Sequence, residues 1–140
     1  MRRTHCCEWA IVCTVIFSGV AASAQDTCER LSGAKVPNTT ITLAQTIAAG
    51  TFNGPPAPFS GVDVTQLYKS LPAFCRVVAE AKPTSDSDIK LEVWLPASGW
   101  NGKLQGIGNG GFAGLIDAMQ LAISVKSGYA ATATDAGHTG

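Results

Sequence analysis

A glycine-rich segment near residue 110 most strongly limits what this chain can fold into. Residues 103–107 have the pattern of a short apolar strand, and three glycines and an asparagine follow at positions 108–111. A helical pattern then extends over 113–126, with Gly128 as its expected C-cap. Glycines between a strand and a helix let main-chain N–H groups approach a ligand, and the helix start adds partial positive charge. The segment therefore predicts a corner that holds a phosphate or a carbonyl oxygen that becomes negative during reaction.

The first 24 residues have the pattern of a secretory signal peptide. Arg2 and Arg3 provide the positive start, residues 10–20 are largely apolar, and Ala-Ser-Ala at 22–24 is a small-x-small cleavage pattern. The apolar stretch is too short for a stable membrane span. We therefore expect cleavage before Gln25, a folded segment over 25–140, and a secreted or periplasmic protein that is free of the membrane. A retained anchor is the alternative.

Cleavage would leave Cys28 and Cys75 as the cysteines of the mature chain. Two cysteines in an exported protein most simply pair with each other, and the loop they would close has about 48 residues. Pairing of one of them with a cysteine in a further part of the protein stays open. The sequence contains no Cys-x-x-Cys pair and no histidine cluster, so no metal site is expected.

The charge balance bears on the partners of the chain. Ten Lys and Arg, less the two in the signal peptide, leave eight, and ten Asp and Glu, less one, leave nine. No basic stripe is present, so nucleic acid is not an expected partner. Asp86 and Asp88 are expected to lie at a solvated hairpin tip rather than to bind calcium. Asn38 begins an Asn-Thr-Thr glycosylation acceptor, which has meaning only in a eukaryotic secretory pathway.

The strand patterns predict the fold class. Residues 71–83 and 89–96 flank a polar turn and should pair as an antiparallel hairpin, and residues 36–47 should also be extended. The strand at 103–107 is short and apolar enough to be central. With the helix and a strand of small residues at 129–134, it forms a crossover. This order predicts an α/β fold, in which an antiparallel hairpin leads into a mostly parallel sheet.

Several chemistries fit the glycine segment. A Walker motif is absent because no Gly-Lys-Ser/Thr follows, but residues 106–111 spell Gly-x-Gly-x-x-Gly and Asp135 lies 24 residues beyond. That match is weak because the first glycine falls inside the predicted strand, and NAD binding remains a minor alternative. In an α/β-hydrolase the loop after the third strand donates an N–H to the oxyanion hole, worth about 3–4 kcal/mol. A tight turn without catalytic role is the other interpretation.

Several blocks of the sequence, in the same order, resemble the tannase/feruloyl esterase family. They are residues 71–77 (LPAFCRV), 85–96 (SDSDIKLEVWLP), 100–103 (WNGK), 108–111 (GNGG) and 134–138 (TDAGH). The resemblance implies an α/β-hydrolase core with a lid domain, and a secreted serine esterase that cleaves gallate, ferulate or related aromatic esters. It also implies that Cys28–Cys75 is a disulfide, and that main-chain N–H groups of Gly108, Asn109, Gly110 and Gly111 form part of the oxyanion hole.

The resemblance also implies that this chain is an N-terminal fragment. The nucleophile of the family lies in a Cys-Ser-x-Gly-Gly block, which this sequence lacks, with the acid and histidine further on. We therefore expect a segment without triad and lid that is inactive and marginally stable by itself. Asp135 and His138 precede the place of the triad partners, so we expect them to support the loop by hydrogen bonding. Ser98, Ser124 and Ser127 are expected turn and helix residues.

The expected ligand is a small aromatic ester. No cofactor is expected in this segment, although a structural calcium in the missing lid is compatible with the family. The oligomeric state stays open. The competing functional hypothesis is a non-catalytic secreted binding domain derived from the same fold.

Overall fold

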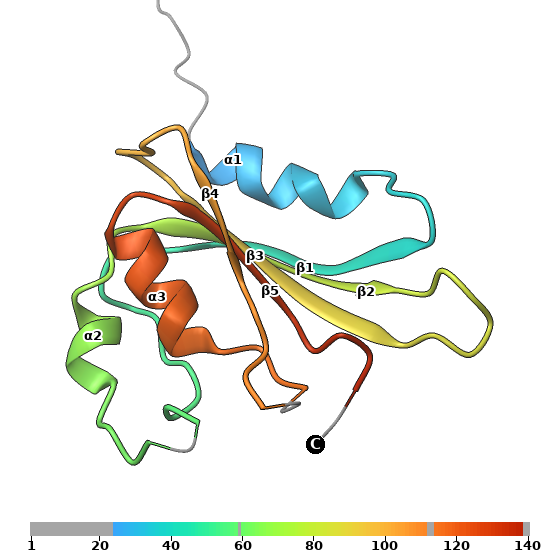
Figure 1. Cartoon of the computed structure of the whole chain (residues 1–140). Helices are drawn as coiled ribbons and strands as arrows, with labels where there is room; N and C mark the ends of the chain where they lie inside the picture. The colour runs from blue at the N-terminus through green and yellow to red at the C-terminus, as the bar shows by residue number, and fades with distance from the viewer. Residues whose placement is uncertain (1–23, 59, 112–113, 139–140) are drawn as a thin grey trace, which may run out of the picture.

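The computed structural model describes residues 24–58, 60–111 and 114–138, which form a five-stranded mixed sheet with helices on both faces (Figure 1). The predicted signal peptide lies outside the described residues, apart from Ala24. The elements in chain order are α1 (Ala24–Glu29), the 3-10 helix η1 (Arg30–Gly33), β1 (Thr39–Ile47), α2 (Thr65–Lys69), β2 (Phe74–Ala81), β3 (Ile89–Pro96), β4 (Leu104–Ile107), α3 (Ala118–Lys126) and β5 (Ala130–Thr134). No helix among these described residues combines the length and apolarity that crossing a bilayer requires.

The strands lie in the order β1-β2-β3-β5-β4. The predicted β2–β3 hairpin is confirmed, and β1 extends it on the outer side of β2. The prediction of a mostly parallel sheet is wrong for this segment. β5 pairs antiparallel with β3, and among the described strands only β4 and β5 are parallel.

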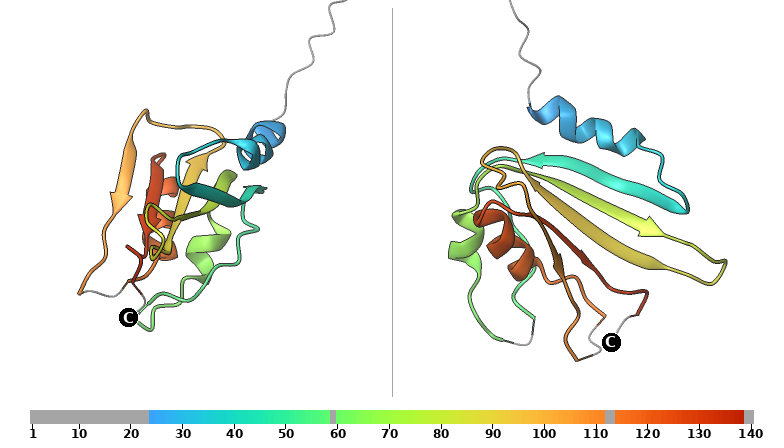
Figure 2. Two further views of the ribbon diagram at one scale, coloured as in Figure 1. Left: turned by 90° about the vertical axis from the view of Figure 1, so that its right-hand side faces the viewer. Right: turned by 45° about the horizontal axis from the view of Figure 1, so that its top comes forward.

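The strand at 103–107, which the sequence predicts to be central, lies at one side of the sheet that the described residues form. β5 enters between β3 and β4, so β4 forms the edge of the described sheet (Figure 2). Leu104 at its start is 65% exposed. The sequence suggested a central strand because the segment is short and fairly apolar, but that local pattern carries no information on which strand inserts beside it.

An aromatic cluster fills the core between the sheet and α3. Trp94 is fully buried and stacks on Phe74 at 4.6 Å between ring centroids, and Phe52 meets the Trp94 ring edge-on at 4.7 Å. The Glu92 carboxylate accepts hydrogen bonds from Trp94 Nε1 (2.7 Å) and from the Arg76 guanidinium (2.8 Å from Nε). Its side chain raises the pKa of Arg76 above the ordinary value. The polar pair is thus satisfied inside an otherwise apolar layer.

α3 begins at Ala118, five positions after the predicted start at residue 113, which lies outside the described residues. Asp117 caps it, because its Oδ1 accepts hydrogen bonds from the N–H groups of Met119 (3.0 Å) and Gln120 (3.2 Å). Leu121 and Val125 face the sheet and are buried. The alanines of β5 let the helix lie close to the strand.

A disulfide joins the opposite face of the sheet to α1. Cys28 and Cys75 are bonded, with Cα atoms 5.6 Å apart, which confirms the expected pair. Leu31 and Val77 pack beside it. Glu29 adds a hydrogen bond from Thr46 N to its Oε1 (2.8 Å), and this bond lowers the pKa of Glu29.

The tip of the β2–β3 hairpin carries a small ion network. Glu80 Oε1 lies 2.6 Å from Lys82 Nζ and 3.1 Å from Lys90 Nζ. Hydrogen bonds from Lys82 and then Lys90 lower the pKa of Glu80 to about 2. Asp88 also contacts Lys90 Nζ, at 2.5 Å. Within the described residues, no group of three or more His, Cys, Asp or Glu side chains could hold a metal ion.

Candidate functional site

The glycine segment lies at the carboxyl end of β4, beside the carboxyl end of β5 (Figure 2). Because β4 and β5 are parallel, the loops that follow them meet at one edge of the sheet, where α/β proteins commonly bind ligands. A cavity of about 500 Å³ lies between these loops. It is lined by Asn109, Gly111, Gly114, Asp135, Ala136 and His138.

The main-chain N–H groups of residues 108–111 form no hydrogen bond to another described residue. Gly108, Gly110 and Gly111 have open space where a Cβ atom would be, and Gly111 has a φ of +59°. A glycine is favoured there because the left-handed region is costly for residues with a Cβ. The segment therefore has main-chain donors that bond to no described residue, and two of its residues, Asn109 and Gly111, line the cavity.

Asn109 differs from its glycine neighbours because both ends of its side-chain amide are hydrogen-bonded. Its Nδ2 donates to the Thr134 carbonyl oxygen at 2.7 Å, and its Oδ1 accepts from Leu115 N at 3.0 Å. The amide thus connects the glycine segment to the end of β5 and to the chain that leads into α3. The sequence predicts a place in the site only for the main chain of Asn109.

Asp135 is buried, and its carboxylate accepts hydrogen bonds from main-chain N–H groups. Its Oδ1 accepts hydrogen bonds from Lys90 N (2.9 Å) and Gly137 N (2.8 Å), and its own N–H donates to Lys90 O (3.1 Å). His138 N donates to Asp135 O at 3.1 Å. These bonds order the loop after β5. No hydrogen bond joins the Asp135 carboxylate to the His138 imidazole among the described residues, so the two do not form a catalytic dyad here.

Gly114 sets the distance between the two loops. Its φ is +56°, and a Cβ atom there would overlap the His138 carbonyl oxygen and lie 2.7 Å from the His138 carbonyl carbon. Only glycine allows this approach of one main chain to another. The loop before α3 and the loop after β5 therefore pack directly on each other.

The serines lie away from the cavity lining. Ser124 and Ser127 lie in α3 and at its C-cap, as predicted, and their Oγ atoms donate to the carbonyl oxygens of Gln120 (2.9 Å) and Ile123 (3.0 Å). Ser98 lies in the bend after β3. None of the three is placed as a nucleophile.

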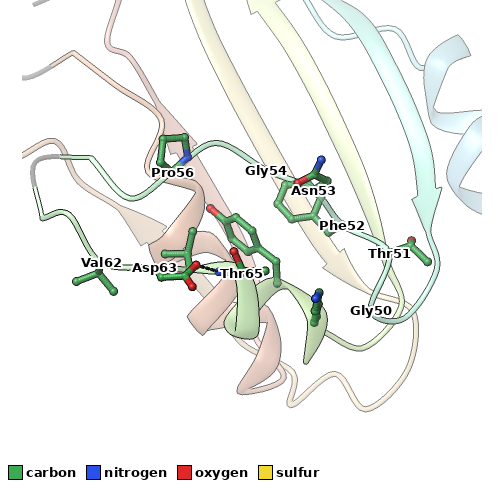
Figure 3. Close-up of a pocket in the computed structure, with 12 residues that line it drawn as sticks. Gly50, Thr51, Phe52, Asn53, Gly54, Pro56, Val62, Asp63 and Thr65 are labelled. Atoms are coloured by element: carbon green, nitrogen blue, oxygen red, sulfur yellow. Dashed lines mark hydrogen bonds between the residues drawn. The ribbon is translucent and has the colours of Figure 1, made fainter.

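A second cavity, of about 440 Å³, lies between residues 50–56 and 62–69 (Figure 3). Its polar groups serve the local structure. Asp63 Oδ1 accepts from Thr65 N at 2.8 Å, and hydrogen bonds from Thr65, first from its side chain, lower the pKa of Asp63. The Tyr68 hydroxyl donates to Pro55 O at 2.7 Å, and burial raises its pKa. With no activated group, this cavity is the weaker candidate.

The comparisons with known proteins bear on the cavity beside the glycine segment. Residues 75–140, which include both of its loops, match the family described as tannase and feruloyl esterase. This part of the chain belongs to the tannase and feruloyl esterase family. The tannase and feruloyl esterase match thus begins at the disulfide cysteine of β2 and includes β3, β4, α3 and β5.

Individual proteins extend the likeness. The chain is 43% identical over 117 residues to an uncharacterized esterase of Xanthomonas campestris, which covers 84% of this chain and 19% of that protein. It is 31% identical over 109 residues to feruloyl esterase C of Talaromyces stipitatus, covering 75% and 19%. The crystal structure of feruloyl esterase B from Aspergillus oryzae superposes with a TM-score of 0.68 at 29% identity, covering 84% and 22%. The chain therefore spans about a fifth of the length of these relatives.

Proposed function

We propose that this chain is the amino-terminal segment of a secreted serine esterase that hydrolyses aromatic carboxylic esters of the feruloyl or galloyl type. One observation carries the proposal. The N–H groups of residues 108–111 are free of bonds to described residues, and they lie at the carboxyl ends of two parallel strands beside a cavity. The likeness to feruloyl esterases supports the substrate class.

In the proposed reaction, a serine outside this segment attacks the ester carbonyl carbon while a histidine takes its proton. The carbonyl oxygen becomes an oxyanion, and N–H groups of Gly108, Asn109, Gly110 and Gly111 supply part of the hydrogen bonding that stabilises it. The histidine then protonates the departing alkoxide, and water releases the aromatic acid from the acyl-enzyme. This segment alone, without nucleophile and base, is expected not to catalyse.

Proline substitution tests the N–H groups, because proline removes the donor and alanine keeps it. In the full-length protein, Gly110→Pro and Gly108→Pro are compared with Gly110→Ala and Gly108→Ala, using methyl ferulate and methyl gallate as substrates. Loss of one oxyanion donor should lower kcat by about 10² to 10³. We expect such a loss in at least one proline variant but not in its alanine counterpart. Equal kcat in every pair would contradict the proposed role of these two N–H groups.

The competing function is a secreted binding domain without catalysis, favoured by the absence of a nucleophile and base pair among the described residues. Calorimetric titration of the full-length protein with methyl ferulate separates the two. Binding without release of ferulate would support the binding domain, whereas turnover supports the esterase.

A further inference from the structure

We infer that the side chain of Asn109 is a positioning residue for the N–H donors of the glycine segment, an inference that rests on the proposed esterase function. Asn109 lies second in the segment 108–111. Its amide donates to Thr134 O at 2.7 Å and accepts from Leu115 N at 3.0 Å. Both ends of one planar group are therefore engaged with two different elements.

The other residues of the segment 108–111 are glycines, which have no side chain to form such a bridge. At Gly108, Gly110 and Gly111 no described residue has an atom within 4 Å of the position that a Cβ would take, so no described side chain holds the segment from that side. Glycine main chain is the most freely rotating in proteins, and a free loop would sample many donor directions. The Asn109 amide is thus the described side-chain contact that fixes the segment between β5 and α3.

Fixed donors matter because an oxyanion hole stabilises the transition state through preorganisation. Catalytic groups need to be held within about 0.5 Å of their productive positions. If the loop samples other conformations, only the competent fraction of molecules reacts, and the rate falls by that fraction. Substrate binding, which uses the rest of the site, changes less. The signature of a positioning role is thus a fall in kcat with a nearly constant KM.

The chain offers a matched control in Asn101, at the opposite end of β4. Its Nδ2 donates to Ser127 O at 3.3 Å and its Oδ1 accepts from Lys103 N at 2.9 Å. The Asn101 amide therefore also makes one bond at each end. It connects the residue before β4 to the C-cap of α3, although its bond from Lys103 N lies within a local turn. Asn101 does not line the cavity of the candidate site. Substitution there measures the cost of losing such a bridge without touching the donors.

The test compares Asn109→Ala and Asn101→Ala in the full-length protein, with methyl ferulate as substrate. Two lost hydrogen bonds predict that Asn109→Ala lowers kcat by about tenfold to hundredfold, with KM changed less than about threefold. For Asn101→Ala we expect kcat within about threefold of the wild type. Wild-type kcat in Asn109→Ala, or an equal loss in both variants, would overturn the inference.

Asn109→Asp adds a pH signature. An ionised aspartate can accept from Leu115 N but presents an oxygen to the Thr134 carbonyl, whereas the protonated acid can donate to that carbonyl. The ratio of the Asn109→Asp kcat to the wild-type kcat should therefore rise as the pH falls from 7 to 5, while the Asn109→Ala ratio stays constant. A constant ratio for Asn109→Asp would count against the bridge to Thr134.

Amide hydrogen exchange separates failure of this inference from failure of the proposed function. If the wild type hydrolyses no aromatic ester, the esterase function fails, but exchange over residues 108–115 still reports the loop. Faster exchange there in Asn109→Ala than in Asn101→Ala supports the clamp, and unchanged exchange overturns it.

Discussion

Gly114→Ala should destabilise the site more than any other single alanine in the glycine-rich loop. The residue has a φ of +56°, and the left-handed region costs an alanine about 1 kcal/mol or more. The new Cβ would also overlap the His138 carbonyl oxygen and lie 2.7 Å from its carbon. Overpacking against main chain adds about 1–3 kcal/mol, because neither loop can rotate away as a side chain would. We therefore expect a total loss of about 2–4 kcal/mol of unfolding free energy.

Alanine substitution at two other glycines separates the conformational cost of the positive φ from the cost of overpacking. Gly111 has a φ of +59° but open space around it, so Gly111→Ala should cost only the conformational term, about 1 kcal/mol. Gly110 has neither a left-handed φ nor a close neighbour, so Gly110→Ala should be nearly neutral. Urea unfolding of the three full-length variants, followed by tryptophan fluorescence, gives the order. If Gly114→Ala unfolds at the same urea concentration as Gly110→Ala, the close contact between residues 114 and 138 is refuted.

Three further predictions concern stability of the full-length protein. Replacing Cys28 and Cys75 together by serine opens a loop of about 48 residues and should cost about 4 kcal/mol in urea unfolding, and a loss below about 1 kcal/mol would contradict this estimate. Glu80 has a pKa lowered to about 2, so its ion network stabilises the fold above its ordinary pKa of 4.5, and this contribution disappears as the pH falls through about 2. Glu80→Gln should accordingly melt below the wild type at pH 7 and together with it at pH 2, and a gap that persists at pH 2 would be inconsistent with this. Glu92→Gln leaves Arg76 without its ionic partner in a half-buried site and should cost about 2 kcal/mol, measured by urea unfolding, with Glu80→Gln showing a smaller loss.

The local parts of the fold could be predicted from the sequence. Alternating apolar residues around a polar turn specified the β2–β3 hairpin, and the helical spacing before Gly128 specified α3. The cysteine count favoured the Cys28–Cys75 pair, and the resemblance to tannases and feruloyl esterases agreed with it and added the family. α2 was missed because a helix of five residues has no measurable periodicity.

The non-local parts could not be predicted. Insertion of β5 between β3 and β4 depends on contacts between residues about 40 positions apart, which no local pattern encodes. The same holds within the site, where the bond from Asn109 to Thr134 crosses 25 positions. The glycines predict a ligand-binding corner at residues 108–111. The bond from the Asn109 side chain, however, depends on the positions of both strand ends, which the sequence does not give.

The strand order has a consequence for how the chain acquires its shape. β1, β2 and β3 are neighbours in sequence and in space, so this meander can form early as the chain emerges. β4 follows in the sequence, but it pairs only with β5 among the described strands. It therefore cannot join the sheet until β5 has paired with β3. Within this segment, the loops at the carboxyl ends of β4 and β5 are therefore expected to become ordered after the meander, and a chain interrupted before residue 130 would leave β4 without its partner strand and exposed to proteases.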